Sequence, residues 1–346
     1  MEKLRLTIGG FSLIIKALEG LDMGTKERLL SLLEGHKGEY FSGEEIARLL
    51  SVSRTAVWKA VNTLRADGYE IDAVQNRGYC LDAHTDILSV SGIRQQLDSR
   101  WESLELELIP CAASTNALLR ERAANGAPEG TVILANQQTQ GRGRLGREFY
   151  SPPDTGIYLS LLLRPQALEP TQAVKITTMA AVAACRAIEA VSGKQAQIKW
   201  VNDIFLNGKK VSGILTEASI SLESGRLDYA VLGIGFNVYP PAGGFPPALA
   251  EIADSILRNQ QNQGKNLLAA SFLNHFLDIY HGDDPAEYAA AYRERSMVIG
   301  QPIQVISPSG VRNAYALDVD KDCRLIVRYE DGTIDRLSSA EISIRA

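Results

Sequence analysis

The sequence predicts a multidomain protein of the α+β class. Its 346 residues exceed the usual size of a single domain. Three observations predict the arrangement. Short helical patterns and a hairpin come first, apolar strands around a long alanine-rich helix occupy the middle, and short alternating strands fill residues 301–346.

The composition is that of an ordinary globular protein, with 45% hydrophobic and 22% charged residues. The net charge of −5 gives no general affinity for nucleic acid, so any DNA contact would need a local basic surface. No apolar run is long enough to span a bilayer. The four separated cysteines and four scattered histidines indicate neither a disulfide framework nor a zinc site. We therefore expect a cytoplasmic protein that binds no membrane.

Residues 1–22 faintly resemble a signal peptide. Lys16 interrupts their apolar run, however, and no small-residue cleavage site follows. We expect them to form a disordered extension without a function.

Three short helices and a hairpin are expected between residues 23 and 85. The first helix is leucine-rich. Ser42, three residues before Glu45, has the capping-box spacing that begins a second, and Ser53 can cap a third that runs over residues 54–67. A hairpin with a Gln-Asn-Arg-Gly turn follows. This order of elements is typical of a winged helix-turn-helix domain.

The third helix has an apolar face and a face suited to DNA. Its outer face is polar, and the segment from Ser53 to Ala66 holds three Lys/Arg residues and no acidic residue. The expected DNA contacts are Ser53, Arg54, Thr55, Trp58, Lys59, Asn62 and, at the turn, Arg77. The alternative is a winged helix used only for protein contacts, because the region as a whole holds eight Lys/Arg residues against nine Asp/Glu residues.

The middle region alternates apolar strands with two helices. The expected strands are 104–109, 131–135, 157–163, the two arms of a hairpin within 198–217, and 229–238. The expected helices are 114–124 and 171–191. The tail should add strands at 302–306, 314–318, 325–329, 333–337 and 341–344.

A glycine- and arginine-rich loop over residues 138–153 has the sequence QTQGRGRLGREFYSPP. Glycine lets a ligand approach the backbone closely, and arginine offers a planar fork for carboxylate or phosphate oxygens. The loop is therefore predicted to close over an anion; the alternative is a solvated turn. The alternating residues are Gly141, Arg142, Gly143, Arg144, Gly146 and Arg147.

The hairpin over residues 198–217 carries a second set of charged residues. Asn207-Gly208 is a strong type I′ turn signal, with Lys199 and Asp203 before it and Lys210 after it. Lysines among apolar neighbours are costly to bury unless they meet an anion. The hairpin therefore indicates part of an anion site, unless it is exposed and its lysines are solvated.

Two further features leave alternatives open. Ser114, Thr115 and Asn116 begin a helix, where they can cap it or hydrogen-bond a ligand. Gly233 and Gly235 share one face of a strand, where they leave room for a flat ligand or relieve packing. With no Ser-His-Asp, Cys-His or P-loop pattern present, the set indicates charge neutralisation rather than covalent catalysis by the enzyme.

Four segments together resemble the motifs of biotin–protein ligases in order and spacing: GRGRLGR at 141–147, KWVND at 199–203, KKVSGIL at 209–215 and GIGFNV at 233–238. With the winged helix, the chain from about Gly24 onward resembles the bifunctional form, ligase and biotin operon repressor. The resemblance implies a winged helix at 23–85, a mixed-sheet α/β catalytic domain similar to class II synthetase cores at 86–295, and an SH3-like β-barrel at 296–346.

The resemblance also implies a reaction. Biotin and ATP, which carries Mg²⁺, give biotinyl-5′-adenylate and pyrophosphate, and a lysine of biotin carboxyl carrier protein then takes the biotin. No dedicated metal site is expected. The adenylate would also act as corepressor, promoting a homodimer that binds operator DNA.

Site residues follow from the residue chemistry above together with the resemblance. The implied catalytic residues are Arg142, Arg144, Lys199, Asp203 and Lys210. The implied biotin pocket is Ser114, Thr115, Asn116, Gln138, Gly141, Arg142, Gly143, Arg144, Lys210, Gly213, Gly233 and Gly235. The implied nucleotide contacts are Arg144, Arg147, Phe149, Asn202 and Asn237.

Two other functions remain compatible with the same scaffold: a ligase whose winged helix no longer regulates transcription, and a ligand-sensing repressor without catalysis. The basic third helix argues against the first, and the intact set of Lys199, Asp203 and Lys210 argues against the second. The chain also has Val201 where the family commonly has proline, and Phe149 where it often has tryptophan.

Overall fold

The computed structural model describes residues 24–165, 168–169, 172–221, 223, 225–282, 284–307, 310–338 and 340–344. The extension expected at residues 1–22 lies outside them. The chain forms two compact units, Met1–Gln96 with Gln260–Asn266, and Leu97–Asn259 with Leu267–Ala346. Each is described by itself.

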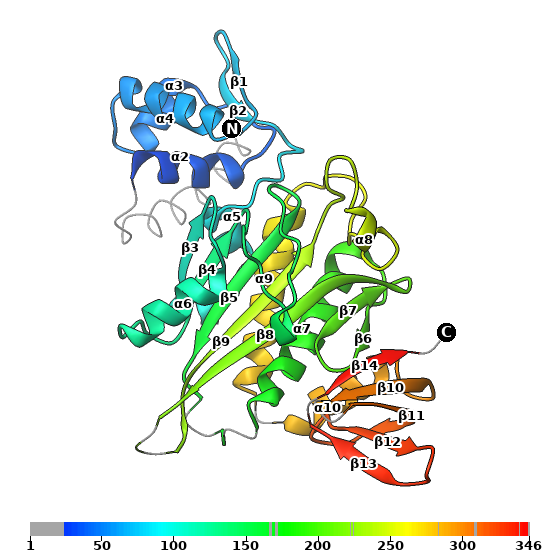
Figure 1. Cartoon of the computed structure of the whole chain (residues 1–346). Coiled ribbons are helices and arrows are strands. Elements are labelled where there is room, and N and C mark those ends of the chain that lie inside the picture. The colour runs from blue at the N-terminus through cyan, green and yellow to red at the C-terminus, as the bar shows by residue number, and fades with distance from the viewer. Residues whose placement is uncertain are drawn as a thin grey trace. The chain divides into compact units, whose positions relative to one another are not determined.

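The first unit contains the predicted three helices and hairpin (Figure 1). They are α2 (Thr25–Glu34), α3 (Gly43–Leu49), α4 (Arg54–Ala66), β1 (Ile71–Val74) and β2 (Gly78–Leu81), followed by a short α5 (Val90–Gln96). The Ser42 hydroxyl accepts from the Glu45 N–H at 3.1 Å, and the Ser53 hydroxyl accepts from the Ala56 N–H at 3.1 Å. Both predicted caps are therefore confirmed.

The core of this unit is formed by the apolar faces of its three helices. Val57, Val61 and Leu64 of α4 are fully buried against leucines of α2 and against Ile46 of α3. Because these residues recur at helical spacing, the opposite face of α4 is left for solvent. The hairpin strands pair antiparallel, with Val74 opposite Gly78 at the turn.

The second unit is built on a mixed seven-stranded sheet of order β3-β4-β5-β9-β8-β7-β6. Only β3 and β4 run parallel; the other neighbours are antiparallel. The strands are β3 (Glu105–Ile109), β4 (Thr131–Ala135), β5 (Gly156–Leu163), β6 (Gln197–Lys199), β7 (Asp203–Leu206), β8 (Lys209–Ile220) and β9 (Leu227–Asn237). The predicted mixed sheet is confirmed, but Lys199 lies on a separate strand, β6.

Helices cover both faces of this sheet (Figure 1). On one face, Leu119 and Ala123 of α6 (Thr115–Ala124) pack with Val231 of β9. On the other, Phe236 of β9 meets Phe272 of α9 at a ring distance of 5.7 Å. The remaining helices are α7 (Val174–Ser192), α8 (Pro247–Ala250), α9 (Gly264–Tyr280), α10 (Pro285–Arg295) and the 3₁₀ turns η1 (Ser99–Trp101) and η2 (Arg144–Gly146). Alternation along β9 thus places its odd-numbered residues on the α6 face.

The C-terminal region is an antiparallel five-stranded sheet of order β13-β12-β11-β10-β14. Its strands are β10 (Pro302–Ser307), β11 (Gly310–Val319), β12 (Leu325–Tyr329), β13 (Ile334–Leu337) and β14 (Glu341–Ile344). The Trp200 indole N–H donates to the Cys323 carbonyl at 3.0 Å, which ties this region to the larger sheet. The predicted small β-domain is confirmed, and its closure into an SH3-like barrel stays a prediction.

None of the helices in the described part of the chain combines the length and apolar character that crossing a bilayer requires.

Candidate active site

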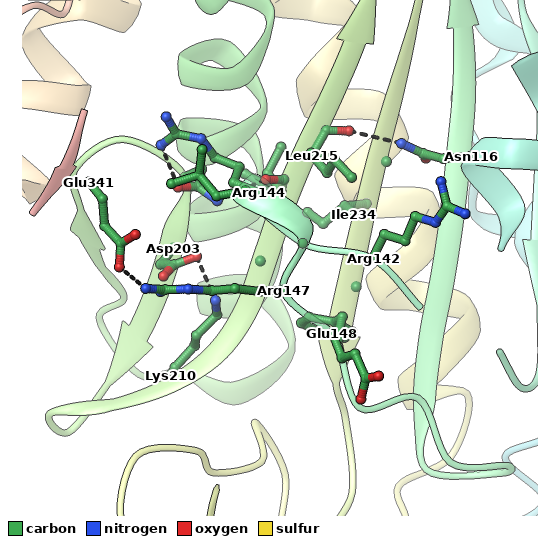
Figure 2. Close-up of a pocket in the computed structure, with 18 of the residues that line it drawn as sticks. Asn116, Arg142, Arg144, Arg147, Glu148, Asp203, Lys210, Leu215, Ile234 and Glu341 are labelled. Carbon is green, nitrogen blue, oxygen red and sulfur yellow. Dashed lines mark hydrogen bonds and ion pairs between the residues drawn. The ribbon is translucent and has the colours of Figure 1, made fainter. Parts of the chain in front are cut away.

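A pocket lies on the α6 face of the sheet, where the glycine- and arginine-rich loop passes over β7, β8 and β9 (Figure 2). It brings together the first turn of α6, this loop, the KWVND segment and part of β14. The predicted residues that line it are Ser114, Thr115, Asn116, Gln138, Arg142, Gly143, Arg144, Arg147, Phe149, Lys199, Asn202, Asp203, Lys210, Gly213, Gly233 and Gly235.

Two residues of the predicted set do not line the pocket. The Asn237 side-chain amide instead donates to the Asp254 carbonyl at 3.2 Å. The Gly141 carbonyl accepts from the Phe149 N–H at 2.9 Å, and a Cβ on Gly141 would lie 2.4 Å from the Phe149 carbonyl oxygen. Gly141 therefore lets the two arms of the loop approach each other.

The glycine- and arginine-rich loop turns at Leu145 and Gly146, which have φ angles of 55° and 75°. The Gly143 N–H donates to the Arg147 carbonyl at 2.7 Å and closes the turn. Leu145 stands at the tip with 76% of its surface exposed. The turn directs Arg144 and Arg147 to different partners.

Arg144 and Arg147 both contact protein groups at the pocket. Arg144 Nη1 donates to Asn202 Oδ1 at 3.3 Å, and Arg147 forms an ion pair with Glu341 of β14. Figure 2 shows Arg142 directed toward the Asn116 side of the pocket, apart from the pair of Asp203 and Lys210. The arginines therefore serve different parts of the pocket.

The hairpin that carries Lys210 has the predicted turn, since Asn207 and Gly208 both have positive φ angles, 50° and 78°. Lys210 Nζ lies 2.6 Å from Asp203 Oδ1 across the two strands. Their side chains are 32% and 25% exposed, so the alternative of a fully solvated lysine is wrong. Lys199 Nζ lies 5.9 Å from the centre of the Phe205 ring.

The start of α6 supplies both a cap and pocket-lining polar groups. Ser114, Thr115 and Asn116 are all buried. The Ser114 hydroxyl is a weak cap, 3.5 Å from the Ala117 N–H. Gln138 Oε1 accepts from the Thr115 N–H at 2.9 Å, which joins the loop to the helix start. This end of the pocket is polar and, apart from Arg142, uncharged.

The two glycines of β9 make room for side chains of the pocket. A Cβ on Gly233 would lie 2.1 Å from Asn116 Oδ1, and one on Gly235 would lie 2.4 Å from the Phe149 ring. The Phe149 ring also lies against Gly213, 3.3 Å from the position of a Cβ there. A flat group is therefore present on Gly235 and Gly213, and it is the phenyl ring of Phe149.

Tyr158 supports Phe149 from the adjacent strand, with a ring distance of 6.4 Å in an edge-on arrangement. Its hydroxyl donates to the Pro152 carbonyl at 2.9 Å. Burial raises the pKa of Tyr158 well above its ordinary value, so the phenol stays neutral across the physiological range.

The sequence motifs missed pocket residues that come from distant parts of the chain. Ala340 and the first two residues of β14, Glu341 and Ile342, belong to the tail and carry no local motif that points to a site. The described part of the chain contains no cluster of three or more His, Cys, Asp or Glu side chains that could hold a metal ion.

The predicted DNA-contacting residues gather on the outer face of α4 and the hairpin turn. Arg54, Thr55, Lys59 and Arg77 are exposed, and Trp58 is 57% exposed. Arg54, Thr55 and Trp58 line a groove that the hairpin residues Val74 to Asn76 also line. The Arg77 guanidinium lies 4.0 Å from the centre of the Tyr40 ring. Asn62 is half-buried, and the Ser53 hydroxyl is engaged as the helix cap.

Three family models match the chain. Residues 108–237 match the biotin/lipoate A/B protein ligase family, residues 25–80 match a helix-turn-helix domain, and residues 298–345 match the C-terminal domain of biotin protein ligases.

Relatives of known function match nearly the whole chain. It is 36% identical over 329 residues to the bifunctional ligase/repressor BirA of Bacillus spizizenii, covering 92% of this chain and 98% of the relative. It is 27% identical over 330 residues to BirA of Escherichia coli, with 92% and 97% covered. A biotin protein ligase from Aquifex aeolicus, solved in complex with biotin and ATP, has a TM-score of 0.57 at 24% identity, covering 70% of this chain and 98% of that one. That likeness supports the fold.

Proposed function

The chain belongs to the biotin–protein ligases, and within them to the bifunctional ligase/repressors, and on this basis we propose how its pocket and its winged helix work. It is an ATP-dependent ligase that forms biotinyl-5′-adenylate, and it also represses transcription in response to biotin. We propose that the acceptor is a lysine of biotin carboxyl carrier protein. We also propose a cytoplasmic location, which the free cysteines and the need for ATP support.

One observation carries the ligase assignment: the two sides of the pocket differ in charge (Figure 2). Apart from Arg142, the side at Thr115 and Asn116 offers neutral hydrogen-bonding groups, which suit the uncharged ureido ring of biotin. The side at Arg144 and Lys210 is cationic, which suits a carboxylate and a phosphate brought into contact.

Adenylation requires two anions to meet. A biotin carboxylate oxygen attacks the α-phosphorus of ATP, a P–O bond forms, and the bond to pyrophosphate breaks. Arg144 and Lys210 neutralise the charge that keeps the reactants apart, and the loop holds them in line. Lys199 adds a further positive side chain to the lining, and Asn202 orients Arg144 through its 3.3 Å hydrogen bond.

Magnesium fits this site only as an ion that ATP brings with it. The carboxylates of Asp203 and Glu341 already have cationic partners, Lys210 and Arg147. Bound to the phosphates, Mg²⁺ would supply further charge neutralisation, with Asp203 the carboxylate best placed to approach it.

The second step needs a neutral amine on the acceptor lysine, whose ordinary pKa is about 10.4. Asp203 is the carboxylate beside Lys210, at 2.6 Å. Once Lys210 turns to the adenylate, Asp203 is free to orient the incoming ammonium group and take its proton. The amine then forms the amide bond, and AMP leaves.

Biotin-dependent exchange between ATP and pyrophosphate tests the ligase assignment, because it isolates adenylation from transfer. We expect exchange that requires biotin and is lost in Lys210→Met. Absence of exchange would leave a ligand-sensing repressor without catalysis as the function.

The repressor function is tested by a gel shift with DNA upstream of biotin genes, which should require biotin and ATP. Exchange without any shift would identify a ligase whose winged helix no longer regulates.

We further propose that bound adenylate promotes a homodimer, so that two winged helices engage two operator half-sites. The exposed residues of α4 and the Arg77 turn support DNA contact by each copy. Biotin shortage would then release the operator.

A further inference from the structure

A chain of hydrogen-bonded side chains lies beneath the neutral end of the pocket. It links Glu217 on β8, Asn116 on α6, Ser160 on β5, Thr115 on α6 and Gln138 of the loop. Asn116, Thr115 and Gln138 line the pocket, whereas Glu217 and Ser160 stand behind it. The direction of each hydrogen bond decides what the pocket offers to a ligand.

Glu217 and its own strand fix the orientation of the Asn116 amide. Asn116 Nδ2 lies 2.9 Å from Glu217 Oε2 and 3.2 Å from the Leu215 carbonyl, and both of these groups can only accept. Asn116 Oδ1 must therefore point the other way, toward Ser160. The missing side chain of Gly233 leaves the space that Oδ1 occupies.

The orientation of Asn116 passes through Ser160 to Thr115. The Ser160 hydroxyl lies 2.6 Å from Asn116 Oδ1 and donates to it. A hydroxyl has one proton, so when Ser160 donates it to Asn116, none is left for the Thr115 hydroxyl, 2.8 Å away. Gln138 Oε1, 3.2 Å from the Thr115 hydroxyl, is also an acceptor, because it receives the Thr115 N–H.

The Thr115 hydroxyl is thus surrounded by acceptors inside the protein. Its proton is directed into the protein, and a lone pair is left for the pocket. Thr115 therefore accepts a hydrogen bond from a ligand and does not donate one.

We infer that Glu217 is a positioning residue that determines specificity: it fixes the amide of Asn116 and so makes Thr115 an acceptor for a ligand N–H. The inference rests on the proposed function, in which the neutral end of the ligand is the ureido ring of biotin. If the acceptor at position 217 is lost, Asn116 can reverse. Ser160 then donates to Thr115, fills its lone pair, and leaves the Thr115 proton facing the pocket.

Glu217 has a second partner, Arg120 of α6, whose Nη1 lies 2.7 Å from Oε1. If Glu217 acted only through its ion pair with Arg120, its role would be structural. The two roles separate experimentally, because Arg120→Gln removes the ion pair and leaves the acceptor for Asn116 in place.

The test is calorimetric titration of the full-length protein with biotin and with each of the two biotin analogues that carry a methyl group on one ureido nitrogen. In Glu217→Gln the amide oxygen is expected to stay with Arg120, which can only donate, so that the amide NH₂ faces Asn116. We then expect biotin to bind about tenfold more weakly. We also expect the preference for biotin over the more discriminating analogue to fall by about tenfold or more. Arg120→Gln should change the Kd for biotin by less than about threefold.

Glu107→Gln is the matched control. Glu107 of β3 forms an ion pair with Arg122, which lies on α6 as Arg120 does, but this pair does not line the pocket. This variant should bind all three ligands as the parent protein does. An unchanged Kd in Glu217→Gln, an equal loss for all three ligands, or an equal loss in Arg120→Gln would each overturn the inference while the proposed function stands. A parent protein that binds no biotin would overturn both.

Discussion

At the scale of single residues, Arg144 is expected to contribute more to adenylate binding than to folding stability. Its guanidinium is half-buried at the pocket, and its hydrogen bond in the protein is a 3.3 Å contact with Asn202 Oδ1. A contact of this length contributes little to folding, about 1 kcal/mol or less. A charge-assisted bond to an adenylate phosphate contributes more, about 1.5–3 kcal/mol.

We therefore predict that Arg144→Ala releases biotinyl-5′-adenylate about 10- to 100-fold faster than the parent, with a free energy of unfolding within about 1 kcal/mol of the parent value. Stopped-flow measurement of adenylate dissociation and urea unfolding give the two quantities. Arg122→Ala, which removes an ion-paired arginine outside the pocket, is the control. Equal dissociation rates in Arg144→Ala and the parent would refute the role.

Residues inside continuous motifs could be predicted from the sequence, and residues that support them from afar could not. Arg144, Asp203 and Lys210 stand in local patterns whose chemistry is visible. Glu217 lies 101 residues from Asn116, and Glu341 lies 194 residues from Arg147. Only the fold brings such pairs together, so no periodicity or spacing indicates them.

At the scale of elements, helix starts and tight turns were the most predictable features. These features depend on neighbouring backbone groups, so a few adjacent residues are enough to predict them. Examples are the caps Ser42 and Ser53 and the turn Asn207-Gly208. The separate strand β6 was not predicted, because the break after Lys199 depends on pairing with β7 and not on a glycine or proline. The face of Gly233 and Gly235 was predicted, but its occupants, Asn116 and Phe149, follow from other elements.

Helix α2 carries a buried carboxylate that makes the first unit sensitive to pH. Glu34 is 3% exposed and accepts from the Ser89 hydroxyl at 2.6 Å, at the start of α5. Burial raises the pKa of Glu34, and the hydroxyls of Ser89 and Ser91 and the charge of Lys37 offset only part of this effect. The folded state therefore holds the proton more tightly than the unfolded chain.

The consequence is a loss of stability as pH rises. The contribution is most favourable below the carboxyl pKa of the unfolded chain and declines as pH passes through the raised folded value. We predict that protection of α2 and α5 amides from hydrogen exchange, relative to Glu34→Gln at the same pH, falls as pH rises from the ordinary carboxyl pKa through the raised folded value. A ratio that stays constant over this range would contradict the prediction. Glu27→Gln, an exposed carboxyl on the same helix, should show no such trend.

At the scale of the whole molecule, we propose that the two functions depend on one intermediate, the adenylate. The order of the three regions was predictable because each has its own periodicity. The boundaries of the two compact units were harder to predict. The compact unit that contains the winged helix includes residues up to Gln96 and also Gln260–Asn266. The Asp86 carboxylate accepts from the Lys265 N–H at 3.0 Å within it. A contact across this sequence distance leaves no local signal.

The coupling between the functions is expected to run through the glycine- and arginine-rich loop. Leu145 exposes an apolar side chain at the tip of the segment that holds Arg144 and Arg147. When these arginines bind an adenylate, the loop loses conformational freedom. Its ordered apolar tip then forms a surface that a second copy of the chain can bury. By linkage, the adenylate and the second copy then favour each other.

Sedimentation velocity measures this coupling directly. We predict that the full-length protein shifts toward a dimer when biotin and ATP are both present, and that biotin without ATP gives a smaller shift. Arg144→Ala, which retains the adenylate poorly, should remain in the unshifted state at the same concentrations. A distribution that is identical with and without the two substrates would exclude the coupling, and any repression by this chain would then have to act through a preformed species.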